Sequence, residues 1–368
     1  MCLSSKLLVD VYINMIKNFL IIVVLFVSSI LSAKQWVEVY SDSPVESSFS
    51  YDSDGLVSTR ITFKLSGYFK DNSKNGLRVT SPGGVSLLEK GAPDLPIFST
   101  SIQVPDLAEM ELDIIESDFV ELNINDIIPS KGNVTRDVNI SNLPFEKGYR
   151  YEQSSLYPAE ISFLRQPHII RSVRGQTVVF QPFQYNPVLG VLRIYTDIVL
   201  TVKQNGLSAD NPLTRYPSKE RGVKEMENIY KNHFPNYMPI NDRYTPLDEN
   251  GSMLIICHAP FIEAMQPFID WKVKKGIETT LVDVSSIGDA DDIKVFVEEY
   301  YYNQGINFLL LVGDIDQIPS PRFSEGAGSN SPSDTYYGFI PTGDYYPDVF
   351  VGRFSAETEE HVNTMVNR

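Results

Sequence analysis

Cys257 and His258 are adjacent in the chain, and a thiol beside an imidazole is the pair of residue types best suited to nucleophilic chemistry. A thiolate can attack a carbonyl carbon while the imidazole transfers the proton. The pair ends the apolar run 253–257, however, and neighbouring side chains of a strand point to opposite faces of a sheet. Cys257 is therefore expected to be a small core residue. His258 is expected at a strand end, where the ligand sites of parallel sheets gather.

The other histidines and the second cysteine are weaker candidates for catalysis. His168, His233 and His361 have no cysteine close to them in the sequence, and each is expected to be solvated or structural. Cys2 precedes a segment that export would remove, so a mature chain would keep one cysteine and could form no disulfide within itself.

Carboxylates lie at two further places. Asp314 follows the apolar run 308–312 and Gly313, and Asp344 and Asp348 are four residues apart in a polar loop. Carboxylates with main-chain carbonyls between them supply the clustered oxygens that calcium prefers. An ordinary acidic turn has the same pattern, so both interpretations stay open on the residues alone.

The residues from 253 onward predict the elements that would position these groups. Uniformly apolar runs are typical of strands buried on both faces, and they alternate here with segments of helical period. This order predicts a parallel sheet with right-handed crossovers. The expected strands are 253–257, 279–284, 308–312, 335–340 and 349–353, and the expected helices are 261–275, 291–302 and one that starts near 355.

The residues before this half have a different pattern. Ile61, Phe63 and Leu65 alternate with polar residues, which indicates a half-buried strand, and similar runs recur up to about residue 203. We expect an antiparallel β domain, sandwich-like, over 34–203. The Pro-punctuated segment 204–243 predicts an exposed connector, with a short helix at 225–231, of the kind that proteases cut.

Composition limits the class of protein. The 368 residues are 42% hydrophobic and 11% aromatic, with a net charge of −16, which fits two globular domains and argues against a nucleic-acid partner. Residues 1–33 resemble a secretory signal, with 1–14 as an upstream extension before Met15. A membrane anchor is the alternative, but the apolar run is short for a bilayer span. We expect a secreted protein with no stable membrane span.

Several short stretches carry a family resemblance when taken in order. They read GAPDLP at 91–96 with VP at 104–105, PFQYNP at 182–187 with LRIYT at 192–196, RYTP at 243–246, LLVGD at 310–314 with SD at 333–334, and FVGRFS at 350–355. Together they resemble the gingipains, the cysteine peptidases of family C25. The resemblance implies a zymogen in which an N-terminal β prodomain, acting as an intramolecular inhibitor, holds a caspase-like α/β domain inactive.

The resemblance also implies where processing and catalysis take place. A cut after Arg243 would make Tyr244 the first residue of the mature enzyme, and 244–368 would be the first half of the peptidase domain. The family's His/Cys dyad lies beyond residue 368, so we expect the chain to be truncated before the dyad and inactive as given. Protein or peptide substrates are the implied partners of the full enzyme.

The family binds structural calcium, and the resemblance implies ligands here. Asp314 would bind one ion; Asp344, Asp348 and the carbonyls of Pro341 and Tyr346 would bind another. A different class of function stays open: a secreted binding or inhibitory module, derived from a peptidase prodomain, without enzymatic activity. A nucleotide-binding domain is disfavoured, because the first strand of the α/β half is not followed by a glycine-rich phosphate loop.

Overall fold

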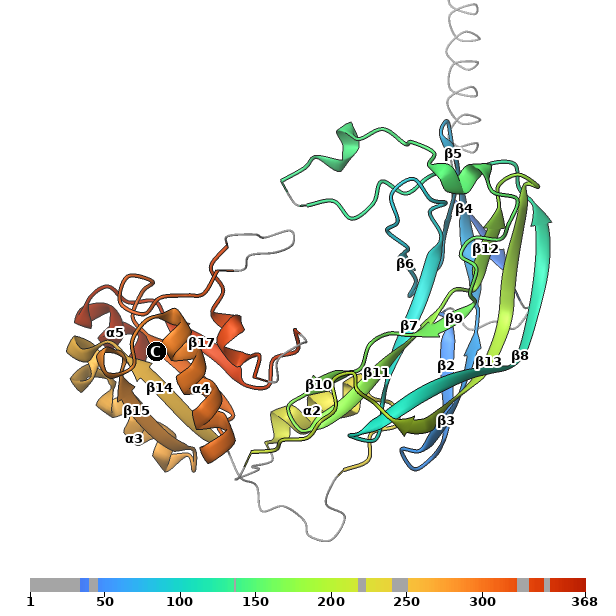
Figure 1. The fold of residues 1–368 in the computed structure, drawn as a ribbon. Helices are drawn as coiled ribbons and strands as arrows, with labels where there is room; N and C mark the ends of the chain where they lie inside the picture. The colour runs from blue at the N-terminus through green and yellow to red at the C-terminus, as the bar shows by residue number, and fades with distance from the viewer. Residues whose placement is uncertain are drawn as a thin grey trace, which may run out of the picture.

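The computed structural model describes most of the chain after the expected signal segment. The residues described are 34–39, 46–135, 137–217, 223–239, 251–322, 331–340 and 345–368. They form an N-terminal β domain and a C-terminal α/β domain, joined by a connector (Figure 1). The expected signal segment 1–33 and the processing residues Arg243 and Tyr244 lie outside the described residues. Among the described helices, none is long and apolar enough to span a bilayer.

The N-terminal domain consists of antiparallel sheets, as its alternating sequence predicts. Ile61 and Phe63 are fully buried, and their polar neighbours face outward, because side chains of a strand alternate between the two faces. The longest strand, Val191–Leu207, pairs on one side with Ala108–Asn123 and on the other with Ser58–Lys64. A single apolar core lies between the sheets.

The strands of this domain have the following bounds. They are β1 Gln35–Glu38, β2 Ser48–Asp54, β3 Ser58–Lys64, β4 Gly67–Ser73, β5 Gly76–Thr80, β6 Val85–Ser86, β7 Pro96–Gln103, β8 Ala108–Asn123, β9 Ser162–Leu164, β10 His168–Ile170, β11 Val173–Phe180, β12 Phe183–Asn186 and β13 Val191–Leu207.

The connector contains helix α2, Lys224–His233, where the sequence predicts a short helix. Met226 and Tyr230 of α2 are buried, and they pack in one cluster with Ile170 and Val173 of the β10–β11 hairpin. This part of the connector is therefore attached to the β domain and is less exposed than its composition suggests.

The α/β domain has the predicted parallel sheet, in the order β15-β14-β16-β17. Its strands are β14 Ser252–Cys257, β15 Glu278–Asp283, β16 Phe308–Val312 and β17 Phe350–Phe354, and its helices are α3 Gln266–Lys274, α4 Ala290–Gln304 and α5 Glu359–Val366. Separate apolar cores lie on the two faces of the sheet, one beneath α4 and one beneath α3 and α5.

Two expected elements differ in the structure. The segment expected as strand 335–340 is largely a 3-10 helix, Asp334–Gly338, because the fully buried Tyr337 and the ion pair of Asp334 fix the chain in a tight turn against the sheet. The segment expected as helix 261–275 begins as two 3-10 turns, and the α-helix starts only at Gln266.

A parallel sheet has two chemically distinct edges, because all strands begin at one edge and end at the other. We call the edge that holds His258, Asp314 and Ser355 the carboxyl edge, since these residues follow β14, β16 and β17. We call the opposite edge, with Gly305–Asn307 before β16 and Asp348 before β17, the amino edge. Ligands of open α/β sheets bind at the carboxyl edge as a rule.

Candidate functional site

Cys257 is not a nucleophile in this structure. Its side chain is fully buried at the end of β14, and its thiol donates a hydrogen bond to the carbonyl oxygen of His258 at 3.4 Å. Burial, and after it the negative charge of Asp283, raises the pKa of the Cys257 thiol to about 12. The sequence-based prediction of a small core residue agrees with this environment.

His258 lies at the carboxyl edge. Its main-chain N–H donates to the carbonyl oxygen of Val312 at 3.0 Å, and its ring contacts Phe261 edge-on, with ring centroids 5.1 Å apart. Gly313 follows β16 with φ 143°, and a side chain there would lie 3.6 Å from the Cβ atom of His258. The strand ends of β14 and β16 therefore bring the His258 imidazole beside the turn that leads to Asp314.

Asp314 is half-buried at the same edge. One of its carboxylate oxygens accepts a hydrogen bond from the Ser355 hydroxyl at 2.6 Å, and its main-chain N–H donates to Ala356 at 2.9 Å. The Ser355 hydroxyl, and after it the main-chain N–H of Ile315, lowers the pKa of the Asp314 carboxyl. Asp314 thus joins the ends of β16 and β17.

A partly buried ion pair holds the loops of this edge together. The Arg353 guanidinium binds both carboxylate oxygens of Asp334, at 2.7 and 2.8 Å. It also donates to the carbonyls of Gly313 and Ile318, at 2.8 and 2.9 Å, and to the Ser320 hydroxyl at 3.0 Å. Despite partial burial, which by itself raises it, the pKa of the Asp334 carboxyl is lowered overall, because Arg353 and Ser320 favour the charged form. The network fixes the loop after β16.

The expected calcium ligands are only partly described. Pro341 and Asp344 lie outside the described residues, and Asp314 lies at the opposite edge from Tyr346 and Asp348. Asp348 is fully buried, and its two carboxylate oxygens accept from the main-chain N–H groups of Arg171 and Ile340. Calcium needs six to eight oxygen ligands, so the described residues alone do not make a calcium cage. Among them, no group of three or more His, Cys, Asp or Glu side chains suits a metal ion.

The amino edge holds a side chain from the other domain. Arg171 lies at the tip of the β10–β11 hairpin, where Ile170 pairs with Val173 and only two residues close the turn. It is 2% exposed. Its guanidinium donates to the carbonyl oxygens of Ile306 at 2.8 Å, Asp348 at 3.2 Å and Gly305 at 3.5 Å.

The electrostatics of this edge favour a cation. Helix α4 ends at Gly305, which adopts the left-handed conformation with φ 71° and ψ 49°. The last carbonyls of a helix carry partial negative charge, and two acceptors of Arg171 belong to the residues that directly follow α4. The guanidinium carbon also lies 5.1 Å from the ring centroid of Tyr301, in the last turn of α4, within the range of a cation–π interaction.

Aromatic contacts surround the inserted arginine. His168 of β10 stacks on Tyr346 with centroids 4.3 Å apart, and its Nε2 atom lies 3.1 Å from Nε2 of His233 in α2. Burial, and after it the neighbouring His233, lowers the pKa of His168 to about 4. Arg215 of the connector lies 3.6 Å above the ring of Tyr302. Figure 1 shows the β10–β11 hairpin and α2 extending from the β domain toward the α/β domain.

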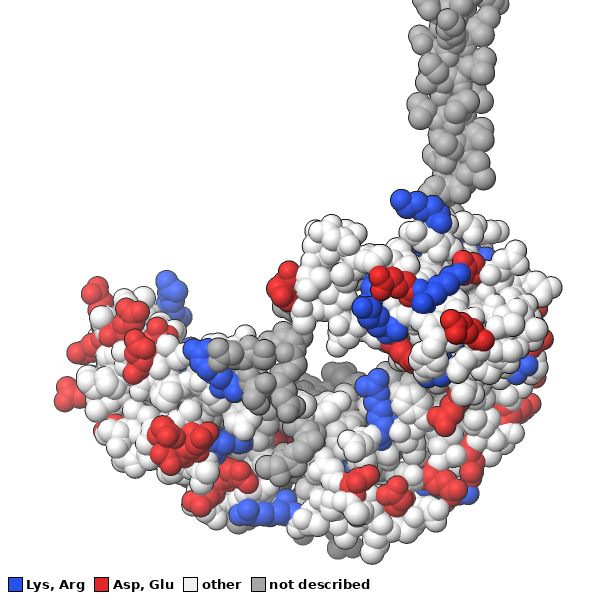
Figure 2. Space-filling model, turned by 45° about the horizontal axis from the view of Figure 1, so that its top comes forward, with Lys and Arg blue, Asp and Glu red and all other residues white. Residues whose placement is uncertain are grey.

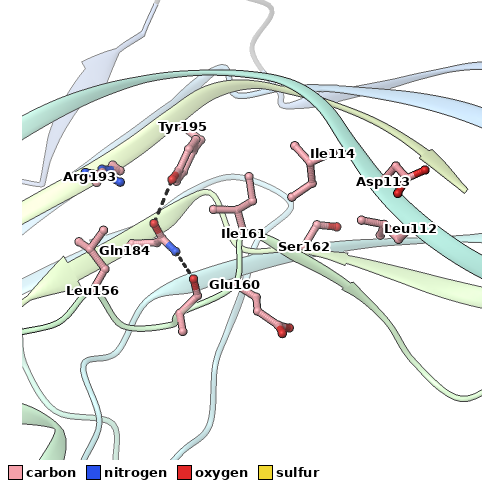
Figure 3. A pocket seen from close by; sticks show the side chains of 11 residues that line it. Leu112, Asp113, Ile114, Leu156, Glu160, Ile161, Ser162, Gln184, Arg193 and Tyr195 are labelled. Carbon is pink, nitrogen blue, oxygen red and sulfur yellow. Dashed lines mark hydrogen bonds between the residues drawn. The ribbon is translucent and has the colours of Figure 1, made fainter.

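A separate open pocket of about 490 Å³ lies in the β domain (Figure 3). Gln184 at its floor is already engaged, because it accepts from the Tyr195 hydroxyl at 3.1 Å and donates to the carbonyls of Pro158 and Ala159. Its rim includes Arg193, which pairs with Glu121 at 2.7 Å. These contacts already engage Gln184 and Arg193.

The surface charge agrees with the composition. On the face shown in Figure 2, Asp and Glu side chains are distributed over both domains, with single Lys and Arg side chains between them. A surface of this kind does not suit a polyanionic partner.

The sequence did not reveal the contact between the domains. Arg171 has only the signal of a charged residue between two apolar runs, and this pattern predicts a hairpin turn but not a buried guanidinium. His168 and His233 are 65 residues apart and were expected to be solvated or structural; His168 is buried, and its ring lies against that of the half-buried His233.

Comparison with known proteins gives the family context. The family model of the C25 propeptide matches residues 57–238, and that of peptidase family C25 matches residues 246–368. Gingipain R1 of Porphyromonas gingivalis is 39% identical over 292 residues, which cover 77% of this chain and 28% of the relative. Gingipain R2 of the same organism is 38% identical over 292 residues, which cover 77% of this chain and 38% of the relative. The chain thus spans well under half the length of these relatives.

A solved structure also matches. The complex of Porphyromonas gingivalis RgpB pro- and mature domains is similar with a TM-score of 0.46 and 33% sequence identity, over 51% of this chain and 96% of the matched chain.

Proposed function

Because the chain belongs to peptidase family C25, we propose that it is part of the precursor of a secreted cysteine endopeptidase, with the N-terminal β domain as prodomain. The main structural support for these two roles is the burial of Arg171 of the β domain against the α/β domain. The Arg171 side chain is buried among main-chain carbonyls of the α/β domain, so the two domains form a specific, hydrogen-bonded interface.

The interface leaves the carboxyl edge free of the contacts made by the hairpin. His258 and Asp314 lie at that edge, where catalytic groups of α/β sheets gather. The hairpin and α2 reach the amino edge instead. The β domain therefore binds the peptidase domain at the amino edge of its sheet. A cut after Arg243 would remove the covalent link between the domains and leave these contacts in place.

The chemistry proposed for the mature enzyme is attack of a thiolate on a peptide carbonyl, with an imidazole transferring the proton. Cys257 is excluded as this thiolate by its burial and its raised pKa. We therefore expect the 368-residue chain by itself to hydrolyse no peptide.

The test uses the native protein recovered from the culture medium of its source with antibodies against the β domain. We expect an acyloxymethyl ketone with arginine at its reactive position to label a cysteine only after the connector is cut. We also expect sequencing of the labelled species to begin at Tyr244. Recovery of an intact, unlabelled protein under all conditions would contradict the proposal and favour a secreted inhibitory or binding module.

Calcium binding stays a proposal for the loop that contains Asp344. Isothermal titration of the full chain with calcium tests it, with the Asp344→Ala variant for the loop and Asp314→Ala for the carboxyl edge. Loss of one binding event in each variant supports both sites. A chain that takes up no calcium at millimolar concentrations overturns them.

A further inference from the structure

The α/β domain supplies several acceptors to Arg171. The carbonyls of Gly305 and Ile306 follow α4, the carbonyl of Asp348 precedes β17, and the ring of Tyr301 closes one side. Main-chain carbonyls at the end of a packed helix have little freedom to rearrange. The acceptors are therefore in position before any guanidinium arrives, which lowers the ordering cost of binding.

The Asp348 carboxylate is fixed in the same way. One of its oxygens accepts from the main-chain N–H of Ile340 at 2.9 Å, within the α/β domain. The other oxygen accepts from the main-chain N–H of Arg171 at 2.5 Å, so it binds the backbone of the turn. The site thus recognises two features at once, the planar cation and the N–H at the tip of a tight turn.

The hairpin gives a second, independent reason. Arg171 has φ 53°, in the left-handed region where glycine and asparagine are favoured in two-residue hairpin turns. An arginine at this position costs backbone energy. Its side chain donates hydrogen bonds to Ile306, Asp348 and Gly305 of the other domain, and these bonds help to offset that cost.

The surrounding contacts exclude water from the arginine. His168 on Tyr346 and Arg215 on Tyr302 flank the insertion, and Phe350 packs against the cluster formed by the hairpin and α2. A desolvated arginine inside a ring of weaker contacts is the usual arrangement of a binding hot spot.

We propose that the α/β domain carries a guanidinium-recognition site at its amino edge, and that Arg171 fills this site as the main anchor of the β domain. The ligand class is an arginine at the tip of a tight turn. The biological meaning rests on the proposed prodomain role, but the binding itself does not depend on peptidase activity.

The test uses the full chain with a recognition sequence for a specific protease in place of residues 240–247, so that the connector can be cut at one place. Association of the two halves after the cut is measured by analytical ultracentrifugation over a range of concentrations. The variants are Arg171→Ala, Arg171→Lys and Arg171→Gly, and the last keeps the turn while removing the side chain. Arg165→Ala is the matched control, because Arg165 is an exposed arginine in the same domain.

We expect Arg171→Ala and Arg171→Gly to weaken association about 100-fold or more, as truncation of a hot-spot arginine does. Arg171→Lys should weaken it about 10-fold, since a lysine cannot present a planar fork to several carbonyls. Arg165→Ala should leave it within about 2-fold, as expected of a residue outside the hot spot. Ethylguanidinium at tens of millimolar should partly restore association of Arg171→Ala, while ethylammonium should not.

Equal association of wild type and Arg171→Gly, or rescue by both cations alike, would overturn the recognition site and leave the peptidase assignment intact. Dissociation of the wild-type halves at every concentration would overturn it as well. If a variant folds poorly in the melting curve, hydrogen exchange of the uncut wild-type chain decides the question. Protection of the main-chain N–H of Arg171 must then match that of the sheet, and exchange at the rate of a free turn would refute the anchor.

Discussion

Arg353 and Arg171 are both arginines that donate to several carbonyl oxygens, and they lie at opposite edges of one parallel sheet. Arg353 binds Asp334, Gly313 and Ile318, all within its own domain. Arg171 binds Gly305, Ile306 and Asp348, none of which belongs to its own domain. The contacts of Arg353 are therefore independent of the β domain, whereas those of Arg171 exist only while the two domains are associated.

The two edges of the α/β domain therefore meet different structural requirements. The carboxyl edge must keep its geometry whether or not the β domain is present, and an internal ion pair can ensure that. Under the proposed prodomain role, the amino edge must hold the β domain and also release it. Main-chain carbonyls suit this purpose, because water can replace the guanidinium at each of them. The Asp348 carboxylate would lose the N–H of Arg171 but keep that of Ile340.

The largest effect is expected from breaking the internal arginine. Arg353→Met leaves the Asp334 carboxylate without its cation, and should lower the free energy of unfolding of the α/β domain by about 3 kcal/mol. Arg193→Met is the matched control, because its pair with Glu121 has the same 2.7 Å distance but is more exposed, and it should cost less than about 1 kcal/mol. Urea unfolding measures both, and equal losses would show that the carboxyl edge does not depend on its ion pair.

The next effect concerns the residue that serves both domains. Asp348→Ala removes the acceptor of the Ile340 and Arg171 N–H groups, and should cost about 2 kcal/mol in unfolding free energy. Hydrogen exchange should show both amides losing protection. The exposed Asp316→Ala should change stability by less than about 0.5 kcal/mol. Loss of protection at Ile340 alone would mean that Asp348 does not contribute to the interface.

A smaller effect separates backbone strain from recognition. Gly305 and Gly206 both have positive φ, 71° and 89°. Alanine at either position should cost about 1 kcal/mol of stability, because an L side chain is disfavoured there. Only Gly305→Ala should also weaken association of the cut halves, since Gly305 supplies a carbonyl to Arg171. If Gly206→Ala weakens association equally, the loss is one of general stability.

The smallest effect is expected at Cys257. Its pKa of about 12 means that the neutral thiol dominates at ordinary pH, and the thiolate forms only as the pH rises toward that value. Alkylation by iodoacetamide in the folded chain should therefore be very slow at pH 8 and should speed up only in strong base or on unfolding. Fast alkylation at pH 8, or peptide hydrolysis lost in Cys257→Ala, would show a reactive thiol at the carboxyl edge.

The sequence predicts the elements well where burial alone decides them. The apolar runs 253–257 and 308–312 are short enough to favour buried strands over helices. The alternation of Ile61, Phe63 and Leu65 with polar residues predicts a strand with one buried face. The segment 335–340 has the composition of a strand, but contacts of Asp334 and Tyr337 with distant residues turn it into a 3-10 helix.

The candidate sites also differ in whether the local sequence could predict them. The interpretation of Cys257 as a core residue follows from its place at the end of an apolar run, and the structure confirms it. The anchor at Arg171 could not be predicted, since it depends on a partner 177 residues further along the chain. Local pattern carries no signal for a contact of that separation.

That separation has a consequence for synthesis. Ribosomes deliver Arg171 long before Gly305, Ile306 and Asp348, so the β domain can complete its core while the receiving carbonyls do not yet exist. Contacts of long sequence separation form late, because closing a long loop costs entropy that only the final packing returns. The β domain can thus be folded when the α/β chain emerges, and Arg171 at its tip then meets the carbonyls that follow α4 and precede β17.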